Sequence, residues 1–406
     1  MLRFAISPIG EMHISDLQIA IFNYIVASQR GEELIVRIED TDKEKNIEAK
    51  DQEILDLLAL FGISYSQVIY QSQNIRFHSA MALQLVHEKK AFSCFCSPSW
   101  IQKKQKEAKK AKKPYLYDDA CRNLPAELVI DNTNPFTIRI AKPDNTNNLD
   151  SFIILNQDKT PTYNFSCAID DMLSNISIVI QSQESVNNRQ KEEHIRESLK
   201  YDKKIEYVHI PPLADAPSVK YLLEQGYLPE AILNYLISTV ISSSQEIFTM
   251  QEAKEWFSLE NISKSPTLFD INMLKHINRE HLKNLDAKEL SRYVGFADTE
   301  IGELARIYLE EVGTTKELKA KIAPIFSKRN IPAKFAEKTA LIVETIKAAP
   351  YFEEYEDFKN HIMKETGLTD EELSKPLCIL LTNAENGPDV AKIYKYLKNY
   401  LGEIIK

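Results

Sequence analysis

The sequence has little glycine. It contains 10 glycines among its 406 residues, whereas an average soluble protein, with about 7% glycine, would contain about 28. None of these glycines lies between Gly62 and Gly226. Loops that grip phosphate groups need glycine for close approach of their backbone. The gap therefore argues against a glycine-rich nucleotide loop in the central part of the chain.

Long apolar runs are also lacking, since none approaches the roughly 18 residues of a membrane-spanning helix. The N-terminus predicts a strand and lacks the basic and apolar pattern of a secretion signal. The five cysteines are an odd number, which together with the missing signal favours a reducing, cytoplasmic location. We therefore expect a cytoplasmic protein with no membrane partner.

The net charge of -9 argues against a simple basic nucleic-acid binder. It does not exclude a nucleic-acid partner, because local basic patches matter more than the total charge. A chain of this length has room for two to four domains.

The first forty residues predict a strand–helix–strand unit. Arg3–Ser7 has the pattern of a strand, His13 opens a helix that stops at Gly31, and Leu34–Val36 begins a second strand. In such βαβ units, ligands bind at the carboxyl ends of the strands. The polar residues expected near that edge are Arg3, Ser7, His13 and Glu39.

This opening resembles a known enzyme family. The matching motifs are RFAxSP from Arg3, GxxHI from Gly10, and RIEDTD from Arg37. This layout resembles the start of glutamyl-tRNA synthetases, which are class I aminoacyl-tRNA ligases. Two later stretches resemble the same family, KTPTYNFSCAIDDM (159–172) and SVKYLLEQGYLPEAILNY (218–235). The likeness covers nearly the whole chain.

The resemblance implies an α/β fold followed by an all-α part. A Rossmann-like class I catalytic domain with an insertion would precede helical stem-contact and anticodon-binding domains. Beyond Ser242 we expect only helices. The implied boundaries are 1–95 and 151–210 for the catalytic domain, 96–150 for the inserted acceptor-end module, 211–265 for the stem-contact region, and 266–406 for the anticodon-binding domain.

The implied activity is that of a glutamate–tRNA ligase acting as a monomer. Glutamate and ATP with Mg²⁺ would form glutamyl-adenylate, and the acyl group would pass to the 3′ end of a tRNA, of either the glutamate or the glutamine isoacceptor. By the resemblance, Arg3 pairs with the substrate's side-chain carboxylate, which suits a guanidinium, and Glu39 binds its amino group. The implied glutamate pocket comprises Arg3, Ala5, Ser7, Glu39 and Tyr163.

On the ATP side, the sequence departs from the family pattern. The family has His-Ile-Gly at the helix start, where this chain has His13-Ile14-Ser15-Asp16. Ser15 to Gln18 instead fits a helix capping box. The family arginine after the strand Ile176–Ile180 is Gln181 here. The residues at the ATP-binding positions are His13, Ser15, Asp16, Gln181 and Glu184, of which His13 and Glu184 are the implied catalytic pair.

The family's Lys-Met-Ser-Lys loop is absent. Only five residues, Leu213–Pro217, separate the landmarks Ile210-Pro211-Pro212 and Ser218-Val219. The join Ala141–Leu149 is also shorter than in the family. Two hypotheses remain open: a ligase with a degenerate ATP site, and a non-catalytic paralogue that binds tRNA or glutamate as a regulatory or assembly factor.

Three cysteines resemble the zinc-knuckle spacing of some family members. Cys94, Cys96 and Cys121 have this spacing, but Asn123 stands where the fourth ligand is expected. Three thiolates leave the tetrahedron of zinc incomplete. We therefore expect no metal and interpret the cysteines as small buried residues.

A lysine-rich stretch lies in the implied insertion. Residues 101–113 contain seven lysines and one glutamate. A solvated helix or loop is the favoured interpretation, and a contact with nucleic-acid phosphates is the alternative.

Overall fold

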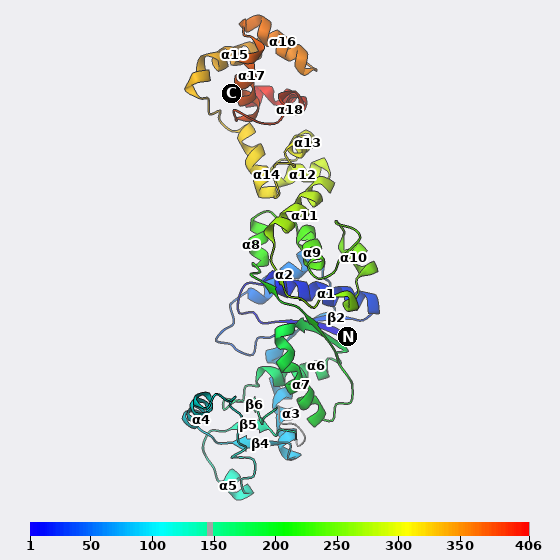
Figure 1. Ribbon diagram of the computed structural model, residues 1–406, viewed down its shortest axis with the longest axis vertical. Coiled ribbons are helices and arrows are strands. Elements are labelled where there is room, and N and C mark those ends of the chain that lie inside the picture. Colours follow the sequence, from blue (N-terminus) through cyan, green and yellow to red (C-terminus); the bar gives the residue numbers. More distant parts are fainter. Residues whose placement is uncertain (144–148, 406) are drawn as a thin grey trace. The chain divides into compact units, whose positions relative to one another are not determined.

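The computed structural model describes residues 1–143 and 149–405 (Figure 1). They form two compact units. The first unit contains 1–219, 239–241 and 250–269, and the second contains 220–238, 242–249 and 270–406. Most of the join predicted to be short, Ala141–Leu149, lies outside the described residues. The finer division into four domains stays a prediction.

A parallel sheet forms the centre of the first unit. Its strand order is β3-β2-β1-β7-β8. The strands are β1 (Leu2–Ile6), β2 (Leu34–Ile38), β3 (Gln67–Tyr70), β7 (Ile178–Ser182) and β8 (Glu206–Ile210). All five residues of β2 are buried, as expected for a parallel strand that is covered on both faces. The predicted strand–helix–strand unit is confirmed.

Helices connect these strands. They are α1 (Ile14–Arg30), α2 (Lys50–Leu60), α3 (Ile75–His87), α6 (Tyr163–Leu173) and α7 (Val186–Ser198), with 3₁₀ turns η1 (Gln71–Asn74) and η2 (Gln183–Ser185). The predicted Rossmann-like α/β part is therefore present.

An antiparallel sheet follows α3 in the chain, in the order β4-β5-β6. Its strands are β4 (Ala91–Cys94), β5 (Thr137–Ile140) and β6 (Ile153–Leu155), and the helices between β4 and β5 are α4 (Pro98–Lys110) and α5 (Ala126–Ile130). The lysine-rich helix α4 buries none of its residues, which confirms an exposed helix, while the choice between a solvated helix and a contact with nucleic-acid phosphates stays a prediction.

The residues after β8 form a short connector, which we define as 213–218. It begins with β9 (Leu213–Ala214), which pairs in parallel with β10 (Thr267–Leu268). The expectation of helices alone beyond Ser242 is therefore wrong. A strand of two residues is too short to give an alternating pattern in the sequence. The first unit also contains α10 (Met250–Trp256) and the 3₁₀ turn η3 (Leu259–Asn261).

The second unit is helical. Its helices are α8 (Val219–Glu224, from Lys220 onward), α9 (Pro229–Ser238), α11 (Ile271–Asn284), α12 (Ala287–Tyr293), α13 (Thr299–Ile307), α14 (Thr315–Ile322), α15 (Ala336–Ala348), α16 (Tyr355–Thr366), α17 (Asp370–Thr382), α18 (Val390–Leu397) and α19 (Leu401–Ile404), with 3₁₀ turns η4 (Ala323–Phe326), η5 (Ala333–Phe335) and η6 (Lys398–Tyr400). The predicted fold class, α/β followed by all-α, is confirmed. Across the described ranges, no helix is long and apolar enough to cross a membrane.

One glycine of the second unit is required by its surroundings. Gly226 lies between α8 and α9 with φ +87, and a Cβ atom there would lie 2.5 Å from the backbone nitrogen of Lys316. Its carbonyl accepts the backbone N–H of Thr315 at 3.0 Å. A side chain at position 226 would therefore push away the first turn of α14.

Candidate functional site

Two arginines and a glutamate lie together on neighbouring strands of the parallel sheet. Arg3 belongs to β1, Arg37 belongs to β2, and Glu39 directly follows β2. Ala5 is the register partner of Arg37, and residues two apart in a strand share a face. Arg3 and Arg37 therefore lie on one face of the sheet. All three charged residues are buried, with 6%, 2% and 9% exposure for Arg3, Arg37 and Glu39.

Helix α6 supplies the carboxylate that holds both arginines. Asp171 accepts hydrogen bonds from Nε and Nη2 of Arg3 at 3.1 and 3.4 Å, and a short one from Nη1 of Arg37. Nη2 of Arg37 also donates to Oε1 of Glu39 at 3.0 Å. Burial alone would raise the pKa of Asp171, but the two guanidinium groups outweigh it and lower the pKa. The carboxylate thus stays charged.

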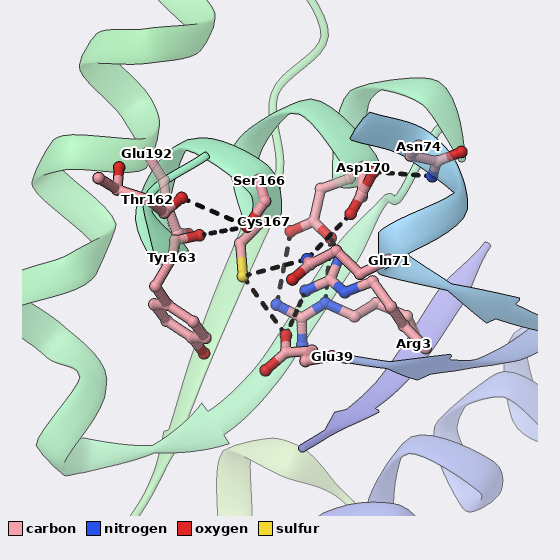
Figure 2. A network of polar contacts seen from close by, with 12 residues as sticks. Arg3, Glu39, Gln71, Asn74, Thr162, Tyr163, Ser166, Cys167, Asp170 and Glu192 are labelled. Carbon is pink, nitrogen blue, oxygen red and sulfur yellow. Dashed lines mark hydrogen bonds and ion pairs between the residues drawn. The ribbon is translucent and has the colours of Figure 1, made fainter. Parts of the chain in front are cut away.

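Two further side chains of α6 lie beside this cluster (Figure 2). The thiol of Cys167 donates to Oε1 of Glu39 at 3.4 Å, and Cys167 is 1% exposed. Tyr163 lies one helical turn earlier and is 53% exposed. Cys167 and Glu39 raise the pKa of Tyr163, so its hydroxyl remains protonated. The cluster is closed on the side of Cys167 and opens to solvent at Tyr163.

The structure brings together three of the five residues predicted for glutamate, namely Arg3, Glu39 and Tyr163. The other two follow the same strand outward, since Ala5 lies within β1 and Ser7 directly after it, both partly exposed. Their roles in binding stay predictions.

Sequence reasoning missed the inner part of the cluster. Arg37, Cys167 and Asp171 belong to the matching motifs, but the sequence pattern assigned them no role. Each is buried and contacts a predicted pocket residue. A signal was present, because two adjacent aspartates in an otherwise uncharged, mostly apolar helix need buried cationic or donor partners.

The first turn of α1 is covered by the connector. His13 pairs with Ser218 in an antiparallel bridge. The imidazole Nδ1–H of His13 donates to the carbonyl of Ala216 at 2.9 Å. The backbone N–H of Ile14 donates to the carbonyl of Pro217 at 3.1 Å. Backbone N–H groups at a helix N-terminus are the donors that bind phosphate, and here the connector uses one of them.

The capping of α1 differs from the prediction. His13 is the N-cap, and the carboxylate of Asp16 accepts its backbone N–H at 3.1 Å. The predicted box from Ser15 to Gln18 is therefore wrong. Ser15 lies inside the first turn, and Nε2 of Gln18 donates to Oγ1 of Thr239 at 2.9 Å. The helix start at His13 agrees with the sequence prediction, and only the capping pair differs, since it is His13 with Asp16 and not Ser15 with Gln18.

The other ATP-side residues lie at the end of β7. Gln181 is within β7 and its Nε2 lies 3.4 Å from Nε2 of His209, its register partner on β8. Glu184 is exposed in η2. Hydrogen bonds therefore tie His13 to the connector and Gln181 to β8, and the predicted pairing of His13 with Glu184 in catalysis stays a prediction.

Three thiols converge in the inserted part. The Sγ atoms of Cys94, Cys96 and Cys121 all lie within 4.8 Å of one another. The hydroxyl of Tyr117 lies 3.3 and 3.4 Å from the first two of these sulfurs. Sequence reasoning sought a fourth ligand at Asn123 and missed the contact of the thiols with Tyr117. Zinc in proteins is bound by thiolate, imidazole and carboxylate ligands in a tetrahedron, whereas burial and the neighbouring thiols raise the pKa of Tyr117, so its hydroxyl stays protonated. The three thiols alone leave the tetrahedron incomplete, and the expected absence of metal stays a prediction.

Comparison with protein families gives one extended match. Residues 1–276 match the family described as tRNA synthetases class I (E and Q), catalytic domain. This match covers more than half of the chain.

Curated relatives match over the full length. The chain is 61% identical to the glutamate–tRNA ligase 2 of Sulfurimonas denitrificans and 44% identical to the glutamate–tRNA ligase 1 of a Nitratiruptor species, each covering 100% of both chains. Both comparisons extend over 432 residues, 26 more than the 406 of this chain. The alignments therefore include positions at which this chain has a gap.

Solved structures match the fold. A glutamate tRNA ligase from Elizabethkingia meningosepticum, in complex with its amino acid, has a TM-score of 0.83 at 20% identity and covers 100% of this chain and 98% of the other. Glutamate-tRNA synthetase from Elizabethkingia anophelis gives a TM-score of 0.80 at 20% identity, with the same coverage.

Proposed function

The chain belongs to the glutamate–tRNA ligase family of class I tRNA synthetases, and we propose that it binds glutamate but forms glutamyl-adenylate far more slowly than family members with an intact ATP site. The site has two halves. The amino-acid half, around Arg3 and Glu39, retains its charged residues, whereas in the nucleotide half the start of α1 is covered by the connector.

Arg3 supports glutamate binding. Asp171 engages Nε and Nη2 of Arg3, and Nη1 has no hydrogen-bond partner among the described residues. A substrate carboxylate bound there would gain a charge-assisted hydrogen bond. Glu39, at the rim of the same cluster, is the anion that suits a substrate ammonium group. Tyr163 would cover the ligand from the solvent side.

The connector is the observation that carries the catalytic part of the proposal. Its backbone occupies both the imidazole of His13 and the N–H of Ile14. The carboxylate of Asp16 lies at the same helix end, where it would repel a triphosphate. The residues present therefore do not fit an ATP–Mg²⁺ complex in this arrangement.

The connector also lacks the charged groups that would assist adenylate formation. It contains no lysine, so it offers no cation to the leaving pyrophosphate. Positioned donors and cations that stabilise the transition state often contribute more to catalysis than any other effect. The lack of such a cation, together with Gln181 in place of an arginine, predicts slow adenylate formation.

A second candidate is a non-catalytic protein that binds tRNA or glutamate as a regulatory or assembly factor. The closed start of α1 favours this candidate, because it works against nucleotide binding. The helical unit and the glutamate cluster, which would bind tRNA and glutamate, are retained.

In either case we propose a cytoplasmic monomer whose partners are glutamate and a tRNA of the glutamate or glutamine isoacceptor.

Calorimetry with each ligand alone tests the proposal. We expect glutamate to bind without ATP, and ATP–Mg²⁺ to give no heat at concentrations that saturate the Sulfurimonas denitrificans relative. ATP binding with the affinity of that relative would overturn the inference that α1 is closed to nucleotide. Absence of glutamate binding would overturn the amino-acid half.

A further inference from the structure

A second buried carboxylate of α6 has a separate set of partners. Oδ1 of Asp170 accepts Nδ2 of Asn74 and Nε2 of His78, each at 2.8 Å, and Oδ2 accepts Nε2 of Gln71 at 2.9 Å. Gln71, His78 and Asp170 are each no more than 1% exposed. All three donors come from one stretch of eight residues, η1 and the first turn of α3. This set ties α6 to α3.

Asp170 and Asp171 therefore hold α6 from two directions. Asp171 binds the arginines of the sheet, while Asp170 binds the donors of η1 and α3. Tyr163 and Cys167 lie on the same helix, about two turns and one turn before the aspartates. A rotation of α6 about its axis would move both side chains relative to Glu39. The contacts of both aspartates oppose such a rotation. Figure 2 shows Asp170 with Gln71 and Asn74.

Among the described residues, the side chain of His78 has one polar partner, Asp170. Its ring is completely buried, and Nδ1 lies among the buried atoms without a hydrogen-bond partner. Burying an imidazole nitrogen without a partner costs free energy. The hydrogen bond from Nε2–H to Asp170 is the polar contact that offsets this cost.

We propose that His78 is a positioning residue for the glutamate pocket: its hydrogen bond to Asp170 fixes α6, and through α6 the positions of Tyr163, Cys167 and Asp171 around Arg3. His78 touches no substrate. One of the proposal's two tests, glutamate affinity, rests on the proposed function. The other, the reactivity of Cys167, does not depend on glutamate binding.

The first readout is glutamate affinity. His78→Leu keeps most of the side-chain volume but removes the donor, and we expect the glutamate Kd to rise at least tenfold. His78→Gln retains an N–H donor at the end of the side chain, and we expect a Kd within threefold of the unmodified chain. His87→Leu is the matched control, because His87 is an exposed residue of the same helix, and its Kd should not change.

The second readout is the reactivity of Cys167, measured by alkylation and peptide mass mapping without glutamate. Cys167 is 1% exposed beside Glu39, so it should react slowly in the unmodified chain. A rotation of α6 exposes it. We expect labelling at least tenfold faster in His78→Leu, and an unchanged rate in His78→Gln and His87→Leu.

These outcomes separate the two proposals. Weaker binding and faster labelling in His78→Leu, with rescue by glutamine, support the positioning role. Equal Kd values and equal labelling in all variants overturn it. If the unmodified chain binds no glutamate, the proposed function fails. The labelling rates then decide whether the hydrogen bond of His78 to Asp170 fixes α6. If His78→Leu does not fold, Asn74→Ala removes a partly buried donor to the same oxygen, and it should change both readouts in the same direction.

Discussion

At the scale of single residues, Arg3 is the group on which glutamate binding depends. Replacing it by alanine removes the guanidinium that would meet the substrate carboxylate. A hydrogen bond to a charged group contributes about 1.5–3 kcal/mol, so we expect the Kd of glutamate to rise by about 10- to 100-fold. Calorimetry measures this change.

The matched control is Arg30→Ala, since Arg30 forms an exposed ion pair with Glu206 at 3.0 Å. Exposed pairs of this kind contribute little to stability. Equal heats of glutamate binding for the Arg3→Ala variant and the unmodified chain would show that Arg3 does not bind the substrate.

Asp171 gives the cluster a defined pH dependence. Its pKa is lowered in the folded chain by the two arginines, whereas an unfolded aspartate titrates near about 3.9. Its contribution to stability is therefore fully present above about pH 4 and is lost as the pH falls further. We expect the difference in unfolding free energy between the unmodified chain and Asp171→Asn to be largest above pH 4 and to shrink below it.

Urea unfolding from about pH 6 to pH 3 measures that difference. A difference that stays constant across the range, or grows at low pH, would mean that Asp171 is not held as a charged carboxylate by Arg3 and Arg37.

The sequence predicted the outer residues of the cluster and not its inner ones. Arg3, Glu39 and Tyr163 were assigned to the pocket by the resemblance to the family. The partner of Arg3 is Asp171, 168 residues away in the chain, and such a pairing depends on how α6 packs on the sheet. For the same reason the sequence did not link His78 with Asp170, or Tyr117 with the three cysteines.

At the scale of elements, the start of α1 shows where local patterns fail. Ser15 to Gln18 is a good capping pattern, but the cap is formed by His13 and Asp16, and His13 also bridges to the connector. The pairing of β9 with β10 was missed because each strand has two residues. Of the parallel sheet, the buried apolar strands β1, β2 and β7 were predicted from the sequence, whereas β3 and β8, which are mostly partly exposed, were not.

The cap of α1 carries a prediction of its own. Asp16→Ala removes the carboxylate that accepts the N–H of His13 at 3.1 Å. Loss of a capping hydrogen bond typically costs about 1 kcal/mol, so we expect a drop of this size in the free energy of unfolding. Urea unfolding measures it, with Asp357→Ala as the control, an exposed aspartate in the first turn of α16. Equal stability of Asp16→Ala and the unmodified chain would show that the cap contributes nothing.

At the scale of the whole molecule, the distribution of charge governs the binding of a tRNA. The net charge is -9, but the exposed lysines of α4 concentrate positive charge on one helix. Phosphate contacts release counterions, so binding through them weakens steeply with salt. We expect a tRNA shift at low salt that is lost as salt rises.

A variant with Lys103, Lys104 and Lys106 changed to glutamine tests the role of α4. The favoured interpretation of α4, a helix that contacts solvent alone, predicts that the tRNA affinity stays within about threefold, a difference well below about 1.4 kcal/mol. A larger loss with a shallower salt dependence would assign phosphate contacts to α4. No shift of tRNA by the unmodified chain at low salt would exclude tRNA as a partner.

Restoring the nucleotide half should need several changes together. They are Ser15→Gly, Asp16→Gly, Gln181→Arg, and a longer loop with lysines in place of residues 213–217. Residues that act as one catalytic unit are strongly non-additive, so each change alone should do almost nothing. The longer loop would also release His13 from Ala216.

The most direct test of slow adenylate formation is glutamate-dependent exchange of pyrophosphate into ATP, measured with tRNA present beside the Sulfurimonas denitrificans relative. Removing one positioned charge-stabilising donor typically slows a reaction about 100-fold or more. With several lost, we predict exchange near background for the unmodified chain and measurable exchange only for the combined variant. Exchange by the unmodified chain within about tenfold of the relative, a barrier difference of only about 1.4 kcal/mol, would contradict the proposed loss of the nucleotide half.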